Sequence, residues 1–349
     1  MRLAFILLVA GFCELVCPKG YDPFFWLMAL RNRGYGYGTL QADTRGGQCP
    51  AECDCPPSFP VAMYCDDRGL REVPYVPFRM KYLYLQRNRI TSIQDGAFDN
   101  ATNLVWVMLH RNQLDSNQIG KMAFVKLINL DRLYLDHNIL SRVPPNLPRS
   151  LRELRLNNNN ISKIQSTSFE GMRNLTILQL HNNALQEVGS ALKGLTSLTV
   201  LDLSKNQLKK VPEGLPKMLQ QLYMEFNSIS AVPANFCNQF SHLQYIRISH
   251  NELTDSGIPP NIFNASGLVE LDLSFNKLEK IPPVSTSLEH LYLQANRIKE
   301  FSLSSFCSVV DVVNFSQLKV LRLDGNEITM NDVPSDAALC LRVASTIEV

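Results

Sequence analysis

The sequence has 349 residues, 45% of them hydrophobic, enough to bury the core of two or three ordinary domains or of one long repeat array. Its 34 basic and 32 acidic side chains leave a formal charge of only +2. This balance argues against a nucleic-acid-binding protein, which normally carries a clear basic excess, and gives no general case for a polyanion-binding surface.

The N-terminal residues predict a secretory signal peptide. Arg2 supplies the positive start, and residues 3–12 form an apolar stretch that is too short to span a bilayer. We expect the signal peptide to cover residues 1–17, with cleavage between 13 and 20. No later stretch reaches eighteen apolar residues, so we expect no membrane insertion.

Residues 18–48 are predicted to form a flexible N-terminal extension. They lack the repeat pattern described below, and glycine and arginine are frequent in them. The residues on which this prediction rests are Arg31, Arg33, Gly34, Gly36, Gly38, Arg45, Gly46 and Gly47.

Nine cysteines give the next constraint. Four of them form the pattern C-x3-C-x-C-x9-C within residues 49–75, which we interpret as a disulfide-bonded N-terminal cap. A zinc site is the alternative, but the spacing lacks paired C-x2-C knuckles. Cys307 and Cys340 stand near the C-terminus. Cys237 is isolated, which favours a buried core residue over a reactive thiol or an intermolecular disulfide.

The pattern L-x-x-L-x-L-x-x-N-x-L recurs through residues 76–349 and predicts leucine-rich repeats. In each copy the L-x-L pair should lie on a short strand with both leucines buried. The asparagine should pair backbone groups of the following turn and of the next coil. Its eleven positions are Asn88, Asn112, Asn138, Asn159, Asn183, Asn206, Asn227, Asn251, Asn276, Asn296 and Asn326.

The spacing of these asparagines predicts the shape of the return segments. It runs 24, 26, 21, 24, 23, 21, 24, 25, 20 and 30, a long-long-short rhythm that ends in one oversized repeat. Short repeats carry Val or Ile before Pro at 143–144, 211–212 and 281–282, which suits extended rather than helical chain. We therefore expect an α/β-type solenoid, a leucine-rich-repeat horseshoe. It should have a parallel sheet on its concave face, a mostly irregular, polyproline or 3-10 convex face, and a long C-terminal capping repeat.

Side chains between the two core leucines should point away from the core, into the concave face. They are Tyr84, Met108, Tyr134, Arg155, Gln179, Asp202, Tyr223, Arg247, Asp272, Tyr292 and Arg322. Flanking positions add Trp106, His110, Asp136, His181, Glu225, His290 and Asp324. Tyrosines beside arginines and acids favour a binding surface over a merely solvated sheet face.

Five N-x-S/T sequons predict N-glycosylation in an exported chain, at Asn100, Asn174, Asn264, Asn314 and, less readily, Asn160. Asn160 directly follows a ladder asparagine, where we expect tight packing. Unused sequons on ordinary loops are the alternative.

No catalytic residue, metal site or cofactor is predicted. His110 and His181 fall three repeats apart, about 14 Å at a strand spacing of about 4.8 Å, which is too far to share one metal ion. The sequence contains no G-x-S-x-G, H-E-x-x-H or phosphate-loop motif. We expect a binding protein and not an enzyme.

The cysteine spacing, the repeat rhythm and the long closing repeat resemble the small leucine-rich proteoglycans of extracellular matrix. The resemblance covers about residues 48–349 and rests on the stretches CPAECDCPPSFPVAMYCDDR, MKYLYLQRNRITSI, LQQLYMEFN, SSFCSVVDVVNFSQLKVLRLDGNEI and LCLRVAS.

This resemblance implies a secreted matrix protein that binds fibrillar collagen and regulates fibril assembly, and that carries keratan sulfate or smaller N-linked glycans. It also implies the disulfides Cys49–Cys55, Cys53–Cys65 and Cys307–Cys340; the cysteine positions alone leave three pairings of the first four open. A soluble ligand trap for growth factors of the TGF-beta type is the alternative function.

The chain departs from the family pattern in three places. Its N-terminal region has only Tyr21, Tyr35 and Tyr37 where relatives carry many sulfated tyrosines. Asn138 is not followed by a sequon, and Thr329 stands where related proteins tend to have lysine. As the collagen-binding patch we predict residues toward the C-terminal end of the concave face: Glu225, Arg247, Asp272, Tyr292, Arg322, Asp324 and Glu327.

Overall fold

A computed structural model describes residues 49–311 and 313–349. The predicted signal peptide (1–17) and N-terminal extension (18–48) lie outside the described residues.

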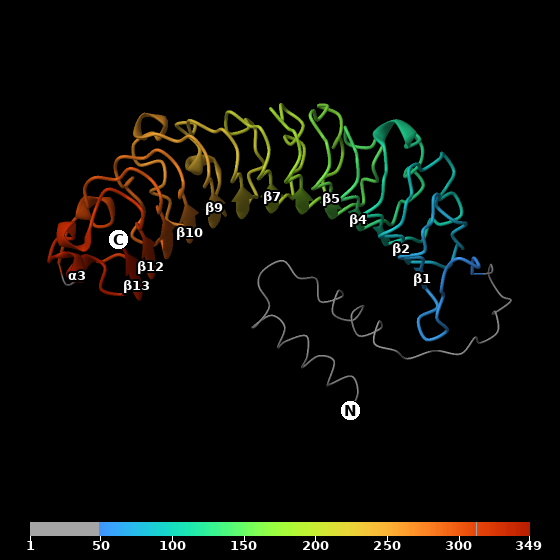
Figure 1. The fold of residues 1–349 in the computed structure, drawn as a ribbon, viewed down its shortest axis with the longest axis horizontal. Coiled ribbons are helices and arrows are strands. Elements are labelled where there is room, and N and C mark those ends of the chain that lie inside the picture. Colours follow the sequence, from blue (N-terminus) through green and yellow to red (C-terminus); the bar gives the residue numbers. More distant parts are fainter. Residues whose placement is uncertain (1–48, 312) are drawn as a thin grey trace. The chain divides into compact units, whose positions relative to one another are not determined.

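The described chain contains one parallel sheet of thirteen strands that follow one another in chain order. Each strand has three residues, and the coils follow an arc whose inner edge is formed by the strands (Figure 1). The strands are β1 (Ala62–Tyr64), β2 (Tyr82–Tyr84), β3 (Trp106–Met108), β4 (Arg132–Tyr134), β5 (Glu153–Arg155), β6 (Ile177–Gln179), β7 (Val200–Asp202), β8 (Gln221–Tyr223), β9 (Tyr245–Arg247), β10 (Glu270–Asp272), β11 (His290–Tyr292), β12 (Val320–Arg322) and β13 (Thr346–Glu348). The predicted solenoid is confirmed.

The leucines of the repeat form one continuous core. In the coil of β7, Leu198, Leu201 and Leu203 are fully buried. Leu201 is in register with Leu178 on one side and Leu222 on the other, so each core leucine packs against its equivalents in the neighbouring coils. A single coil cannot bury these side chains alone, and the stability of the fold therefore comes from stacking.

The predicted asparagine ladder is present. The Asn206 side-chain amide donates to the carbonyls of Leu180 and Leu203 at 3.1 and 3.0 Å, and its oxygen accepts from the Leu185 N–H at 3.0 Å. One amide thus satisfies backbone groups in two coils, which neither leucine nor alanine could do.

The convex side has little helix. It holds the 3-10 turns η1 (Ser116–Gln118), η2 (Cys237–Gln239), η3 (Asp255–Gly257), η4 (Leu303–Ser305) and η5 (Met330–Asp332), and the single helical turn α3 (Ala337–Cys340). Under the longer coils lie fully buried phenylalanines that our sequence analysis did not identify: Phe98, Phe124, Phe169, Phe236, Phe263 and Phe306.

Disulfides lie near both ends of the array. Cys49 is bonded to Cys55 and Cys53 to Cys65, while Cys307 and Cys340 close the long last repeat. These are the pairs that the family resemblance implied. Cys237 is buried in the core, and burial raises the pKa of its thiol to about 12, so this cysteine is not a reactive thiolate at neutral pH.

Candidate protein-interaction surface

The sheet face opposite the leucine core is the candidate site, and we call it the inner face. It carries the first and third residues of each strand and the residue two positions after the strand. Because parallel strands are in register, equivalent residues of successive coils form rows along the arc. Side-chain chemistry on this face is therefore set by contacts between coils.

Aromatic rings and arginines dominate the half of the inner face near β2–β5. The Arg132 guanidinium lies 4.4 Å from the centre of the Trp106 ring, and that of Arg155 lies 4.0 Å from the centre of the Tyr134 ring. Trp106 also meets Tyr82 edge-on, at a centroid distance of 5.3 Å. Such aromatic and arginine pairs are the side chains most often found at the centres of protein interfaces.

Paired charges dominate the half near β8–β12. Arg247 Nε donates to Glu270 Oε1 at 2.7 Å, and the Arg247 guanidinium lies 5.4 Å from the centre of the Tyr223 ring. Asp272 Oδ1 accepts from the Ser274 backbone N–H at 2.9 Å. Our sequence analysis missed Glu270, although it lies two residues before Asp272 and therefore on the same face.

The last strands extend this charged half. Arg322 donates to both carboxylate oxygens of Asp324, at 3.0 and 2.9 Å, and its Nε lies 2.8 Å from Glu348 Oε2 in β13. Tyr292 is in register with Arg322 on one side and Asp272 on the other. Tyr292, Arg322 and Asp324 are all half-buried, so they can contact a partner without rearrangement.

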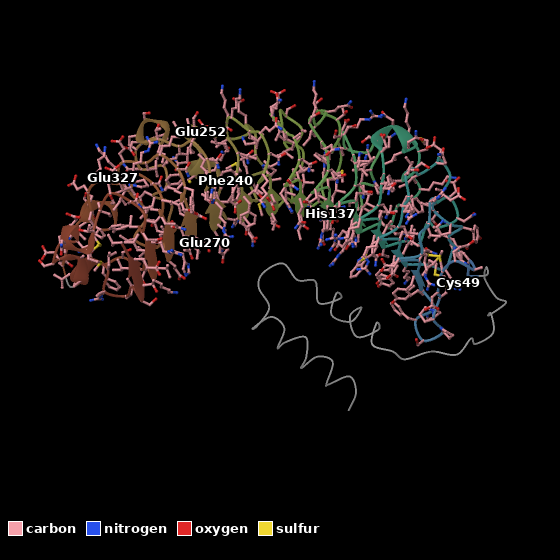
Figure 2. The ribbon with its side chains drawn as sticks, viewed as in Figure 1. Cys49, His137, Phe240, Glu252, Glu270 and Glu327 are labelled. Atoms are coloured by element: carbon pink, nitrogen blue, oxygen red, sulfur yellow. A yellow bond between two sulfur atoms is a disulfide. The ribbon has the colours of Figure 1, made fainter. Side chains whose placement is uncertain are left out.

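Six of the seven predicted collagen-binding residues lie together on the inner face, but Glu327 does not. It follows the ladder asparagine Asn326, where the chain leaves the sheet, and its backbone N–H donates to the Ile298 carbonyl at 2.9 Å. The pKa of the Lys299 amine is raised chiefly by its hydrogen bond to Glu279, and the charge of Glu327 adds a smaller contribution. Figure 2 shows Glu270 at the inner edge of the arc and Glu327 farther from it. Our assignment of Glu327 to the concave face was wrong.

Glu225 has the most perturbed carboxylate of the inner face. Its Oε2 atom is buried without a hydrogen-bond partner. Burial raises its pKa to about 7, and the nearby carboxylates of Asp202 and Asp272 add to the shift, while its own backbone N–H and Arg247 oppose it. This side chain therefore changes charge close to neutral pH.

The histidines of the inner face are separate from one another. His181 Nδ1 lies 2.9 Å from Asp202 Oδ2. Burial lowers the pKa of His110. In the part of the chain that the structure describes, no three His, Cys, Asp or Glu side chains are grouped so that they could hold a metal ion.

All five sequon asparagines are exposed: Asn100, Asn160, Asn174, Asn264 and Asn314. Our expectation that Asn160 is tightly packed was wrong, because Asn159 takes the buried ladder position and leaves its neighbour to solvent. The Asn314 side chain donates to Asp311 at 2.7 Å, and the Asn174 side chain donates to the Arg149 carbonyl at 3.5 Å.

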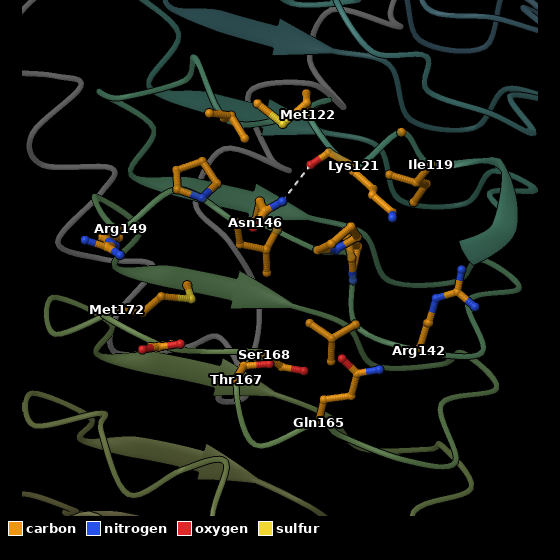
Figure 3. Close-up of a pocket in the computed structure, with 18 of the residues that line it drawn as sticks. Ile119, Lys121, Met122, Arg142, Asn146, Arg149, Gln165, Thr167, Ser168 and Met172 are labelled. Carbon is orange, nitrogen blue, oxygen red and sulfur yellow. Dashed lines mark hydrogen bonds between the residues drawn. The ribbon is translucent and has the colours of Figure 1, made fainter.

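A hollow on the convex side lies over the short coil that contains Pro144, Pro145 and Pro148. Longer coils flank it, and Asn146 donates across it to the Lys121 carbonyl at 3.0 Å (Figure 3). The hollow follows from the short repeat, and its lining combines proline, methionine and scattered polar groups without a catalytic arrangement.

Family comparisons agree with this architecture. Residues 48–77 match the leucine rich repeat N-terminal domain, and residues 78–145 and 149–208 match the leucine rich repeat. Among solved structures, the complex "Octameric complex of Latrophilin 3 (Lec, Olf), Unc5D (Ig, Ig2, TSP1) and FLRT2 (LRR)" contains a chain with the same fold. The TM-score is 0.62 at 24% identity, over 86% of this chain and 92% of that one.

Similarity to individual proteins is high over the whole length. Fibromodulin of Bos taurus is 54% identical over all of both chains, and fibromodulin of Homo sapiens is 60% identical over 90% of this chain and 84% of its own. Lumican of Coturnix japonica is 46% identical over 99% of this chain and 97% of its own. The chain belongs to the small leucine-rich proteoglycan family of extracellular-matrix proteins. Within that family it is similar to fibromodulin and to lumican.

Proposed function

We propose that this protein is a secreted extracellular-matrix glycoprotein or proteoglycan that binds fibrillar collagen and regulates fibril assembly. The observation that carries the proposal is the inner face, where six candidate residues lie in or just after strands β8–β12 and form one charged and aromatic patch. The similarity to fibromodulin and lumican over the full chain supports the same class of function. In the part of the chain that the structure describes, no helix is long and apolar enough to cross a membrane.

The arrangement of the patch fits recognition of a rod-shaped partner. Arg247, Asp272, Tyr292 and Arg322 follow one another along consecutive strands, so positive, negative and aromatic groups alternate in one row. A collagen triple helix is a rod with charged side chains on its outside, and a row of alternating charges can fix its register as well as its affinity.

Glycosylation is part of the proposal. The exposed sequon asparagines lie in return segments and flanks and not in the inner face, so glycans attached there leave the sheet free for a partner. We propose N-linked chains at Asn100, Asn174, Asn264 and Asn314, and the exposure of Asn160 makes it a fifth site. We also propose that residues 1–17 are a signal peptide that directs secretion, and that residues 18–48 are an N-terminal extension.

Co-sedimentation with reconstituted collagen fibrils tests the proposal. The native protein should pellet with the fibrils and change the turbidity curve of fibril formation. Protein that has been reduced and alkylated should do neither, because the terminal disulfides hold the capping repeats. Native protein that stays in the supernatant and leaves the turbidity curve unchanged would refute the proposal. Binding of a TGF-beta-type growth factor in the same preparation would then favour the ligand trap.

A further inference from the structure

The residues that precede the ladder asparagines form a row of their own, which we call the rim column. All eleven have positive φ, between 51° and 72°. They are Arg87, Arg111, His137, Asn158, Asn182, Lys205, Phe226, His250, Phe275, Ala295 and Gly325. The backbone N–H of each of the central members donates to a carbonyl of the next coil, as Phe226 does to Ser249 at 3.0 Å. The fold requires only that this position accept a left-handed backbone, which glycine and asparagine do most readily.

Three consecutive coils place rings at this position. Phe226 and His250 stack at a centroid distance of 4.0 Å and an angle of 9°, and His250 and Phe275 stack at 4.0 Å and 11°. Lys205 covers the other end of the stack, with its Nζ 5.4 Å from the centre of the Phe226 ring. Burial lowers the pKa of His250 against the opposing effect of Asp272, which favours the uncharged ring.

The stack is exposed, and the fold does not account for it. Phe226 and Phe275 are 47% and 45% exposed. Both hold a bulky side chain on a left-handed backbone, at φ 53°, where such residues are genuine outliers. The other coils have charged, polar or small residues at the equivalent rim-column position. Strained and exposed rings that contribute no core burial point to a binding role.

One end of the stack is open. The rim residue of the coil after Phe275 is Ala295, and that of the next coil is Gly325. These two coils are adjacent, because a Cβ built on Gly325 would lie 3.5 Å from the Ala295 nitrogen. Within the rim column, therefore, no side chain larger than a methyl group follows Phe275. At a strand spacing of about 4.8 Å, these two positions extend about 10 Å along the column.

Small side chains lie beside the stack on the inner face. Ser249 and Ser274 are the residues before His250 and Phe275, and both are buried, so they do not stand above the rings. An exposed aromatic face is a surface on which proline-rich chains are recognised, since the imino-acid ring stacks on the aromatic group.

We propose that the open face of Phe275, above Ala295, is a seat for an imino-acid ring on the outside of the collagen triple helix. The inference rests on the collagen binding proposed above and names a contact for it. The ring lies against Phe275 and extends the row Lys205–Phe226–His250–Phe275 by one member. The row of Arg247, Asp272 and Tyr292 runs beside it, so one triple helix can contact both.

Two opposite substitutions test the seat. Ala295→Phe fills it with a ring of the protein's own, on a left-handed backbone at φ 54°, and carries the same kind of strain that Phe275 already carries at φ 53°. Phe275→Ala removes the surface on which the partner ring stacks. Each should weaken binding to collagen fibrils about tenfold or more, as expected for an aromatic anchor. A role in folding alone predicts no loss for Ala295→Phe, because that change adds stacking.

Two controls and a competitor complete the experiment. Phe275→Tyr keeps the ring face and should bind within about twofold of the native protein. Phe78→Ala removes a phenylalanine that is 59% exposed far from the stack, and it should also bind normally. A triple-helical peptide of Gly-Pro-Pro repeats should compete with fibrils for the native protein. Thermal unfolding of every variant confirms that it is folded.

The outcomes separate the two proposals. If the native protein does not bind fibrils, the proposed function fails and the seat fails with it. If the native protein binds and Ala295→Phe or Phe275→Ala binds as tightly, only the seat is wrong. If both variants lose binding but the Gly-Pro-Pro peptide does not compete, the stack contacts a different part of the partner and the imino-acid assignment is wrong.

Discussion

Arg247 and Glu270 form a close ion pair between neighbouring strands of the inner face. Both Nε and Nη2 of the arginine lie 2.7 Å from the same carboxylate oxygen, and the Glu270 side chain is only 8% exposed. The two residues belong to neighbouring strands, β9 and β10. This pair joins two coils and orients a guanidinium that the proposed function uses for binding.

Replacing Glu270 with alanine should therefore affect both stability and binding. The variant leaves a half-buried arginine without its carboxylate, and we expect a loss of about 1–2 kcal/mol in the free energy of unfolding, less than for a fully buried pair. Urea unfolding of Glu270→Ala measures this loss. The control is Glu279→Ala, whose partner Lys299 is well exposed, and which should change stability by less than about 0.5 kcal/mol. Equal effects of the two changes would contradict the role given to Glu270.

Protonation of Glu225 should raise the stability of the protein as the pH falls from about 7.5 toward 5. Its pKa is raised to about 7 in the folded protein, above the ordinary value of 4.5, so the folded state binds the proton more tightly than the unfolded state. The contribution is fully present below the unfolded pKa and is lost as the pH rises through about 7. The groups that face it are Asp202, Arg247 and Asp272.

Melting temperatures of the native protein and of Glu225→Gln, measured across this pH range, isolate the contribution. Glutamine has no charge to desolvate, so the variant should gain most at pH 7.5 and little at pH 5. Two curves that run parallel over the whole range would show that Glu225 does not titrate there.

The C-terminal disulfide should contribute more to stability than the first N-terminal one. Cys307 and Cys340 are 33 residues apart, whereas Cys49 and Cys55 are 6 apart. In the chain-entropy account, the two loops correspond to about 3.7 and about 2.2 kcal/mol of stabilisation. Replacing both cysteines of a pair with alanine avoids a free thiol. The Cys307/Cys340 variant should melt several degrees lower than native and lower than the Cys49/Cys55 variant; the reverse order would contradict the entropic explanation.

Glycans should be removable without unfolding. Because the five sequon asparagines are exposed, peptide N-glycosidase should act on the native protein from animal cells and lower its mass by several chains. The circular dichroism spectrum should stay unchanged. Asn160→Gln measures whether its exposure suffices for modification, and the expected result is the loss of one chain. A mass that does not respond to the enzyme would refute the glycoprotein assignment.

The repeat pattern predicted the backbone of this protein better than its surface. The position of Asn206 relative to Leu201 and Leu203 was enough to predict a strand, a buried leucine pair and a ladder hydrogen bond. These features depend only on residues of one coil or on equivalent residues of neighbouring coils, and the repeat pattern gives both. The partner of Arg247 was not predicted, since an ion pair between coils depends on which side chains the register brings together. Phe98 and its equivalents were missed because return segments vary in length.

Two further signals were present in the sequence. Phe226, His250 and Phe275 all stand one residue before a ladder asparagine, so aligning the coils on that asparagine would have revealed the stack. The same alignment places Glu327 one residue after the ladder, among side chains that leave the sheet. Aligning the coils on the ladder asparagine therefore predicts which side chains share a face better than their distance along the chain does.

Binding of the double variant Tyr292→Ala/Arg322→Ala to collagen fibrils tests the central claim most directly. Both side chains are half-buried on the inner face, so their removal should weaken binding about tenfold or more while leaving the fold intact. Lys126→Ala, which breaks an exposed ion pair with Asp99, is the matched control and should bind as the native protein does. Glu327→Ala, measured in the same assay, shows whether a side chain outside the inner face contributes to collagen binding. A folded double variant that binds fibrils as tightly as the native protein would contradict the account, because collagen would then have to be bound outside the inner face.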